Sequence, residues 1–504
     1  MRKVSRMEQN KEIPAVTTQP AAPAAPLRFA PRDWLALGMG LGCAALWFAV
    51  FGLDNMFDDV FRLPALGAAA VTAALWAGVL LYLGRDAKWN RWNGGLAAMV
   101  GLLTLCCCVY GDLNVRVINY LLIAAGSALC FFSLSGQTSC PLTRARAVPE
   151  TVYLTLRALF SNWGKPFRAL GGLGDGEKKT ARQIALGVLC GAGLLAIVLP
   201  LLISADAVFG SLFSGLTHWL EGIDGFALWR ILRVALLTLA FFSAFYFLRH
   251  GKAREATDGE TPQRPAAPFV TALALLCAVY LIFCAIQFAF LFGGADTAAM
   301  EGGYAEYARS GFFQLVWVAA INLTVTLTCA ALGGNRRSVR IMSTTLLALT
   351  GVILFSAFWR MRLYILAYGL TLKRAETLWA MAFIAVCLLL AALRVWKRGF
   401  RFWPFFAAIG LAGWILFNCV NIDARIAHYN VDAYLSGSLE QIDLGYLAST
   451  SPDALPALTE LRDALGNTLP GDIAEQGLSG LIGRLQRQQA VDWTDWCVSY
   501  VRYK

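Results

Sequence analysis

The uncharged stretch PFVTALALLCAVYLIFCAIQFAFLF, residues 268–292, decides the fold class of this chain. A helix that crosses the hydrocarbon core of a bilayer needs about 20 consecutive, predominantly apolar residues. Residues 268–292 exceed that length without one Asp, Glu, Lys or Arg. Because a segment isolated in lipid must satisfy its backbone hydrogen bonds internally, the stretch predicts a membrane-spanning helix.

Similar runs recur along the chain, so the predicted fold class is an all-α, polytopic membrane protein with about eleven transmembrane helices. The runs lie near residues 34–53, 63–84, 94–110, 117–136, 183–203, 226–248, 268–292, 312–333, 341–359, 376–393 and 403–420. The third is short and the ninth has no clear end, so ten or twelve spans are alternatives. The composition agrees: 58% of the 504 residues are hydrophobic and 15% are charged, against about 45–50% and about 25% in soluble domains.

Changes in composition divide the chain into three predicted segments. Residues 1–33 are polar and then Pro/Ala-rich, which is typical of a disordered tail. Residues 34–420 hold the spans, and the first of them is expected to act as an uncleaved anchor. Residues 421–504 are no longer membrane-like and predict a small helical C-terminal module.

Three helices are expected in the second part of this module. Ser451, Pro452 and Asp453 are typical of a helix start. A second helix is expected over 472–487. A third, over 490–501, places four residues on one face by their three- and four-residue spacing: Trp493, Trp496, Cys497 and Tyr500. We expect the module to dock on the membrane domain through Trp493, Trp496 and the face that carries Leu455 and Leu458.

The distribution of positive charge predicts the orientation. The N-terminal tail and every second connection hold 28 Lys and Arg residues, whereas the intervening connections hold seven. Since Lys and Arg concentrate in cytoplasmic loops, the N-terminus is expected in the cytoplasm of a bacterial cell and residues 421–504 outside the cytoplasmic membrane. The connection 360–375 is an exception, with four basic residues on the predicted outer side.

Cofactor, metal and nucleic-acid functions find no support in the sequence. The chain has three histidines, and most of its 13 cysteines lie inside apolar runs, where a thiol packs as a small hydrophobe. The net charge of +11 resides in short loops between spans. We therefore expect no cofactor, no metal and no nucleic acid. The expected partners are the lipid bilayer and a protein bound through the C-terminal module.

Charged residues near the predicted outer ends of the spans form the candidate site. They are Asp206, Arg230, Arg233, Glu306, Arg309, Arg360 and Arg362. Charges at membrane depth are costly and find partners or water. The set therefore predicts either a structural network of interhelical ion pairs or a solvated cavity that binds a ligand. No residue of the set is expected to be catalytic.

Arg360 and Arg362 follow the ninth run without a turn signal, so the helix is expected to continue through them. Two residues apart on a helix, they point about 200° from each other. One is expected to point inward, toward Asp206 or Glu306, and the other toward water or lipid headgroups.

Two further patterns have alternative interpretations. Asn322, Thr324, Thr326 and Thr328 predict hydrogen bonds within the bundle, with substrate contact as the alternative. Apolar residues near basic ones around residues 154–163 predict either an amphipathic helix on the membrane surface or an ordinary connecting helix.

Several motifs, taken together, resemble a bacterial family of polytopic membrane proteins classed as a domain of unknown function (the 4173/4153-type DUF families). The motifs are Ser204-Ala-Asp206-Ala-Val-Phe209, Tyr304 to Leu315, Arg360-Met-Arg362-Leu-Tyr364, Tyr368-Gly369-Leu370-Thr371, Asn430-Val-Asp432-Ala-Tyr434, Asp443-Leu-Gly-Tyr446-Leu447 and Ser451-Pro452-Asp453-Ala454. The resemblance implies a cytoplasmic membrane protein. It implies no activity, substrate or catalytic residue.

Three functions follow as hypotheses. An envelope-associated scaffold or sensor predicts a tightly packed bundle and an exposed apolar patch on the module. A permease for a small ligand predicts a water-filled cavity that reaches the midplane. An enzyme acting on an anionic lipid-linked substrate predicts an opening toward lipid beside the outer charges. We rank them in that order, because no catalytic motif or internal repeat is visible.

Overall fold

The computed structural model describes most of the helical regions of the chain. The described residues are 29–51, 64–171, 191, 225–251, 264–292, 312–333, 336–397, 399–466, 477–487, 493 and 496–499. Every regular element within these ranges is a helix, so the predicted all-α class is confirmed.

Ten of the described helices are long and apolar enough to cross a membrane. They are α1 (Pro31–Phe51), α2 (Ala65–Leu83), α3 (Arg91–Val109), α4 (Leu113–Ser135), α10 (Gly225–His250), α11 (Ala267–Phe292), α13 (Phe312–Leu332), α14 (Arg337–Tyr368), α15 (Leu372–Trp396) and α16 (Phe402–Cys419). Each corresponds to one predicted apolar run. The remaining run, 183–203, lies outside the described residues apart from Gly191.

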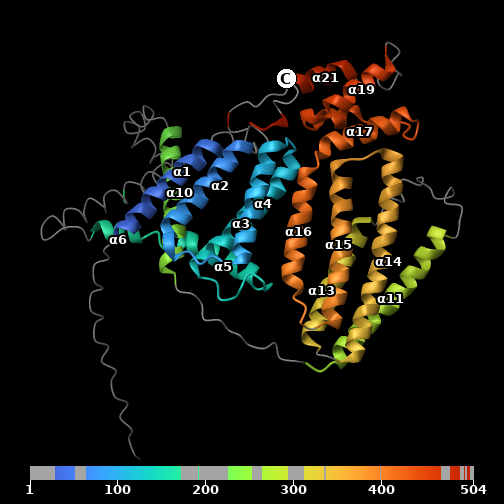
Figure 1. Ribbon diagram of the computed structural model, residues 1–504, viewed down its shortest axis with the longest axis horizontal. Helices are drawn as coiled ribbons and strands as arrows, with labels where there is room; N and C mark the ends of the chain where they lie inside the picture. Colours follow the sequence, from blue (N-terminus) through green and yellow to red (C-terminus); the bar gives the residue numbers. More distant parts are fainter. Residues whose placement is uncertain are drawn as a thin grey trace, which may run out of the picture.

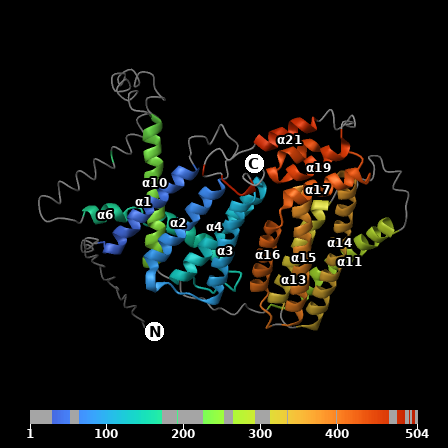
Figure 2. The ribbon, with the colours of Figure 1, turned by 45° about the horizontal axis from the view of Figure 1, so that its top comes forward.

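The spans form two groups that lie next to each other (Figures 1 and 2). Helices α1, α2, α3, α4 and α10 make the first group, in which α1 packs along α10. Helices α11, α13, α14, α15 and α16 make the second, and α16 contacts α3 across the boundary. Short helix α5 (Ala147–Phe160) lies beside the first group, and α6 (Lys165–Gly171) follows it.

Helix α14 is longer than the membrane requires. Its 32 residues give a length of about 48 Å, against a hydrocarbon core of about 30 Å. The helix continues past the apolar run through Arg360 and Arg362 to Tyr368, as expected, turns at Gly369 and is followed by α15 from Leu372. The connection 360–375 is therefore almost entirely helical, as the missing turn signal predicted.

Helix α5 has two different faces. Thr151, Leu154 and Ala158 are buried against the first group, which α5 contacts through α10. A second stripe, at four-residue spacing, is exposed: Val148, Val152, Leu156 and Phe160. One face is packed and the other is apolar and uncovered by described residues, so α5 is a connecting helix packed on the bundle, and its location on the membrane surface stays a prediction.

The C-terminal module consists of α17 (Ile422–Leu435), α18 (Leu444–Ser449), the 3-10 turn Pro452–Ala454, α19 (Leu455–Leu465) and α21 (Leu478–Arg487). It lies over one end of the second group (Figure 1). Its buried residues share one hydrophobic core with the membrane helices, including Leu103 of α3 and Trp414 of α16. Leu455 and Leu458 also belong to this core. Because α19 packs on α17, α21 and the 3-10 turn of the module itself, their expected contact with the membrane helices stays a prediction.

The predicted helix over 490–501 is wrong, because Trp496 and Cys497 have no helical structure. The expected docking through the tryptophans is also wrong: Trp493 and Trp496 are 51% and 40% exposed. Cys497, in contrast, is fully buried. The three described residues therefore do not share a face.

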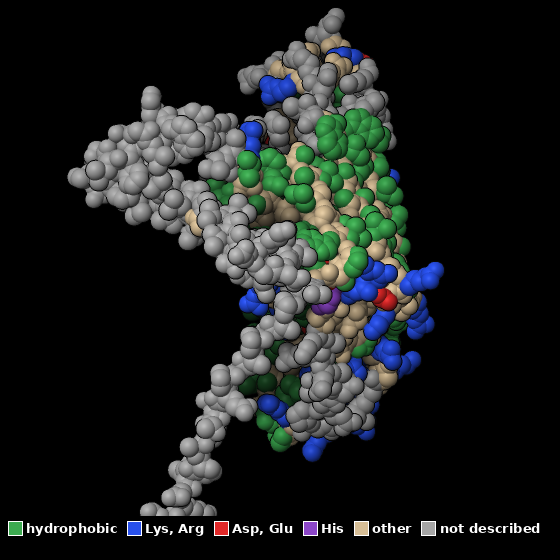
Figure 3. All heavy atoms as spheres, turned by 90° about the vertical axis from the view of Figure 1, so that its left-hand side faces the viewer, with side chains coloured by type: hydrophobic (Ala, Val, Ile, Leu, Met, Phe, Trp, Pro, Cys, Tyr) green, Lys and Arg blue, Asp and Glu red, His purple; other side chains and the backbone are tan. Residues whose placement is uncertain are grey.

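The surface has the polarity of a membrane protein. Figure 3 shows a band of hydrophobic side chains, with Lys and Arg gathered toward one end of the molecule. Large apolar side chains on the spans are exposed, among them Leu81, Leu121 and Trp317. In a bilayer these side chains face lipid, so their exposure carries no cost.

Candidate functional site

The structure describes four of the seven predicted site residues. Asp206, Glu306 and Arg309 lie outside the described residues. Arg230 is exposed and Arg233 is half-buried with its guanidinium over the Trp229 ring. Both belong to α10 in the first group of helices, whereas Arg360 and Arg362 belong to α14 in the second (Figure 1). The structure therefore does not bring these two arginine pairs together.

Arg360 and Arg362 point in different directions, as their spacing predicts. Arg360 is 7% exposed. Arg362 is exposed, with its guanidinium 5.7 Å from the Trp359 ring centroid. The expected pairing of the inward arginine with Asp206 or Glu306 stays a prediction.

A different set of polar groups meets where the C-terminal module contacts the membrane helices, and we call it the junction. Its first part is the turn between α14 and α15. Asn430 of α17 accepts a hydrogen bond from the Leu370 amide at 2.6 Å and donates one to the Leu370 carbonyl at 2.8 Å. The Leu372 amide donates to the hydroxyl of Tyr446 in α18 at 2.8 Å. Two module helices therefore bind the backbone of one turn.

The contact between Asn430 and this turn requires a glycine at position 369. Its φ of 76° lies in the left-handed region, which costs residues with a β-carbon roughly 1–2 kcal/mol. A β-carbon there would also collide with the Asn430 side-chain oxygen. The backbone and the packing both require glycine at this position.

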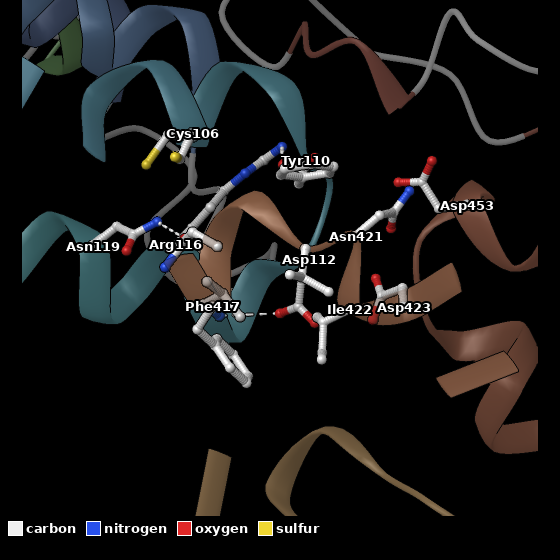
Figure 4. A pocket seen from close by; sticks show the side chains of 14 residues that line it. Cys106, Tyr110, Asp112, Arg116, Asn119, Phe417, Asn421, Ile422, Asp423 and Asp453 are labelled. Atoms are coloured by element: carbon white, nitrogen blue, oxygen red, sulfur yellow. Dashed lines mark hydrogen bonds between the residues drawn. The ribbon is translucent and has the colours of Figure 1, made fainter. Parts of the chain in front are cut away.

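The second part of the junction is a buried group of acids. Asp423 at the start of α17 is 3% exposed, and Asp453 in the 3-10 turn is 1% exposed. Asp112 precedes α4 and accepts hydrogen bonds from the amides of Asn114 and Val115, which caps that helix. Figure 4 shows the Asp112 and Asp423 carboxyl groups next to each other at one side of a small pocket.

Burial and, second, the neighbouring Asp112 carboxylate raise the pKa of Asp423, and hydrogen bonds from Ser451 lower it; together they place the pKa at about 7. Two neighbouring carboxylates cannot both ionise cheaply, which disfavours the charged form of Asp423. The Ser451 amide donates to one Asp423 oxygen at 3.2 Å, and the other Asp423 oxygen has no hydrogen-bond partner among the described residues. Asp423 is thus a buried acid that titrates near neutral pH.

A chain of hydrogen bonds continues from the junction into the bundle. The Trp414 indole donates to the Asn119 side-chain oxygen at 2.7 Å, and the Asn119 amide group donates to Asn418 at 2.7 Å. Asn418 in turn donates to the Trp414 carbonyl at 2.8 Å. The chain joins α4 to α16, with all three side chains buried.

The end of the chain closes the junction. The Val498 amide donates to the Cys108 carbonyl at 3.0 Å, and the Ser499 hydroxyl contacts the Val109 carbonyl at 3.1 Å. The same hydroxyl also hydrogen-bonds the Asp453 carboxylate. The end of α3 and the segment that holds Val498 and Ser499 therefore meet around Asp453.

The cavity at the junction is small. Its volume is about 20 Å³, and Arg116, Asn119 and Asp423 are among its lining residues. A cavity of at least roughly 10–15 Å³ accepts one water molecule, so this space is large enough for about one water and too small for a solute. Within the described ranges no cluster of His, Cys, Asp and Glu has metal-binding geometry.

Sequence reasoning did not select the junction, although a signal was present. Asn119 and Asn418 lie inside predicted apolar runs, and polar side chains there mark interhelical contacts. Asp112 and Asp423 are far apart in the chain, so no local pattern connects them. The motifs that carry the family resemblance did contain several junction residues: Gly369, Asn430, Tyr446, Ser451 and Asp453.

The fold and the junction define a polytopic helical membrane protein whose C-terminal helices are packed on its membrane bundle. The family model described as a domain of unknown function, DUF4153, matches residues 97–461. The chain belongs to this family, as the motifs predicted. The match covers both parts of the junction apart from Val498 and Ser499. No curated protein and no solved structure gave a match.

Proposed function

We propose that this protein is a scaffold or sensor of the bacterial cytoplasmic membrane, in which the docking of the C-terminal module responds to protonation of Asp423. The observation that carries the proposal is the contact of two carboxyl groups, Asp112 and Asp423, across the interface between the bundle and the module. A buried acid at a docking surface couples proton binding to the strength of docking.

The proposed orientation has the N-terminus in the cytoplasm and the module outside. The Lys/Arg-rich connections α2–α3 and α13–α14 lie at the end of the bundle opposite the module (Figure 1), which supports this orientation. The proposed division at residues 1–33, 34–420 and 421–504 follows from the same reasoning. In this orientation Asp423 faces the periplasmic or external side, where pH varies with the environment.

The direction of the pH response follows from the raised pKa. Between about pH 4 and 7 the docked Asp423 holds a proton that an undocked, solvated Asp would release. Docking is therefore strongest at acidic pH and weakens as the pH rises through about 7. The full effect is on the order of 2–4 kcal/mol.

Other titratable and charged groups face Asp423 from the packed elements. They are Asp112 and Arg116 on the α4 side, Asp453 in the 3-10 turn, Tyr446 of α18 and the thiols of Cys106 and Cys107. Arg116 is cationic throughout the relevant pH range. Asp423 is the group in this set whose pKa is raised to about 7.

At the junction, two observations favour a scaffold or sensor over a permease or an enzyme. The junction cavity admits about one water molecule, which is too small for a transported solute. Trp493 and Trp496 are exposed on the module side, and exposed aromatic side chains are typical of protein interaction surfaces. In this proposal a protein partner binds at these tryptophans and responds to whether the module is docked.

Amide hydrogen exchange of the purified protein, corrected for its intrinsic pH dependence, tests the proposal. We expect exchange in residues 444–465 to increase severalfold between pH 5.5 and 8 in the wild type. Asp423→Asn keeps an acceptor for the Ser451 amide without the charge. Amide exchange of residues 444–465 in this variant should therefore stay low at both pH values. Asp432→Asn changes an exposed acid of the same helix and serves as the matched control. A pH response that survives in Asp423→Asn contradicts the proposal.

Photocrosslinking in cells tests the partner. A photoreactive residue at position 496 is expected to capture a specific envelope protein, with a yield that differs between pH 5.5 and 8. The Asp423→Asn background should remove the difference. Crosslinking to lipid alone would show that the exposed tryptophans anchor the module at the bilayer surface instead.

A further inference from the structure

The last turn of α3 carries three consecutive cysteines, Cys106, Cys107 and Cys108. Successive residues of a helix point about 100° apart, so the three thiol groups have different surroundings. Cys107 is buried beside Arg116 of α4. The Cys108 thiol approaches the Ala65 carbonyl of α2 at 3.9 Å. Cys106 is the member of the triplet on the side of α16, as its neighbours show.

The last residue of α16 is a fourth cysteine, Cys419. The hydroxyl of Tyr110, which follows α3, donates to the Cys419 carbonyl at 2.9 Å. Cys106 lies one helical turn before Tyr110, whose amide donates to the Cys106 carbonyl at 3.2 Å, so the two residues lie on the same side of α3. Cys106 also lines the same cavity as Asn418 and Val420, which flank Cys419. These contacts place Cys106 and Cys419 next to each other.

The two thiol groups are close enough to interact directly. Both are free thiols in the structure, with Cys106 half-buried and Cys419 exposed. Figure 4 shows Cys106 at the side of the pocket away from Asp423 and Asp453. A disulfide requires the sulfur atoms to approach to about 2.05 Å, and both cysteines lie at helix ends, which adjust more readily than helix centres. An external oxidant can therefore reach the pair through Cys419.

We propose that Cys106 and Cys419 form a disulfide bond in the cell, which joins the two groups of membrane helices beside the junction. The inference rests on the proposed orientation of the protein, with the module outside the cytoplasm, where disulfides form and persist. It does not depend on the protonation of Asp423. The oxidant is the disulfide of an extracytoplasmic thiol-oxidising protein.

The bond forms by two thiol–disulfide exchanges. The exposed Cys419, as thiolate, attacks one sulfur of the oxidant's disulfide, and the other sulfur of the oxidant leaves as a thiolate. The Cys106 thiolate then attacks the Cys419 sulfur of this mixed disulfide and displaces the oxidant. The two cysteines lose two electrons and two protons together, and the oxidant takes up both as it becomes a dithiol.

The position of the bond gives it a structural consequence. Helix α3 belongs to the first group of spans and α16 to the second, and α16 leads directly into α17 of the module. Oxidation would therefore fix the start of the module relative to α3 by a covalent bond. This restraint adds to the hydrogen bonds that Asn119 makes with Trp414 and Asn418 between α4 and α16.

Mass spectrometry of the full-length protein from intact cells tests the proposal. The cells are quenched in acid, and free thiols are blocked with N-ethylmaleimide under denaturing conditions before digestion. We expect the peptides that hold Cys106 and Cys419 to be linked in most of the protein and to separate after reduction. Cys140, a half-buried thiol that follows the opposite end of α4, should carry the blocking group.

Three variants assign the bond. Cys106→Ser and Cys419→Ser should each abolish the link, whereas Cys107→Ser changes the adjacent thiol on the α4 side and should keep it. Thermal unfolding verifies folding of each variant. It also measures the restraint: reduction should lower the melting temperature of the wild type by several degrees and leave that of Cys419→Ser unchanged.

Treatment of the purified, reduced protein with oxidised glutathione separates the geometry from the orientation. A link that forms with glutathione but is absent in cells would overturn the proposal through the orientation on which it rests. If no link forms with glutathione either, the pairing itself is wrong, and the orientation is left to the reporter fusions. A link that survives in folded Cys106→Ser would assign the bond to a different thiol and would also overturn the proposal.

Discussion

The side chain of Asn430 binds both backbone groups of Leu370, accepting from its amide at 2.6 Å and donating to its carbonyl at 2.8 Å. This pair joins the first helix of the C-terminal module to the turn between α14 and α15. A backbone turn offers its amide and carbonyl in fixed geometry, and an asparagine side chain is complementary to both. The contact therefore fixes the position of the module relative to two membrane helices.

Replacing Asn430 with Asp should loosen the module. Asp keeps the acceptor for the Leu370 amide but places a second oxygen against the Leu370 carbonyl, where the wild type has a donor. The expected loss is about 1–3 kcal/mol, because a buried carbonyl is left unsatisfied. Thermal unfolding in detergent measures it. The exposed change Asp432→Asn on the same helix should have no such effect, and equal melting temperatures for the two variants would refute the role of Asn430.

Asn119→Leu should weaken the contact between α4 and α16. The substitution removes the acceptor of the Trp414 indole and the donor to Asn418. Hydrogen bonds between membrane helices contribute about 0.6–1.7 kcal/mol each, so about 1–3 kcal/mol is expected for the pair. Unfolding by a denaturing detergent provides the measurement. The exposed Asn114→Leu in the first turn of α4 is the control, and a comparable loss in both variants would speak against the chain of bonds.

Arg360 and Arg362 should respond differently to substitution, although they are two residues apart. Arg360 is buried and Arg362 is exposed. Arg360→Ala removes a buried charge and is expected to lower the free energy of unfolding by about 3–5 kcal/mol. Arg362→Ala removes a contact with Trp359 of about 0.5–1 kcal/mol. Steady-state abundance in membranes and thermal unfolding both report the difference, and similar values for the two would argue that burial does not distinguish them.

Reporter fusions test the proposed orientation. Alkaline phosphatase fused after Lys504 should be active, because it requires an oxidising, extracytoplasmic location. A fluorescent protein that folds only in the cytoplasm should be active at the N-terminus and dark after Lys504. The reverse pattern for the C-terminal fusion would place the module in the cytoplasm, and Asp423 would then meet a buffered pH.

The sequence predicted the membrane helices well, because spanning a bilayer is a local requirement. The length and hydropathy of about 20 residues decide whether a segment spans the bilayer, whatever other helices pack against it. The sequence also predicted that α14 continues through Arg360 and Arg362 and that one of these arginines is buried and the other exposed. Helical geometry fixes the directions of nearby side chains. The sequence failed for Trp493 and Trp496, whose regular spacing suggested a buried face, because spacing indicates a helix but cannot tell what covers it.

By itself, then, the sequence determined the all-α class, the position of the spans, the charge asymmetry and the family. Only the tertiary structure decided the junction, where Asp423 meets Asp112 and Asn430 binds Leu370. Each of these contacts joins residues that are distant in the chain. The reason is physical: backbone hydrogen bonding and transfer into lipid act on each segment separately, whereas burial of a carboxyl group depends on which helices pack together.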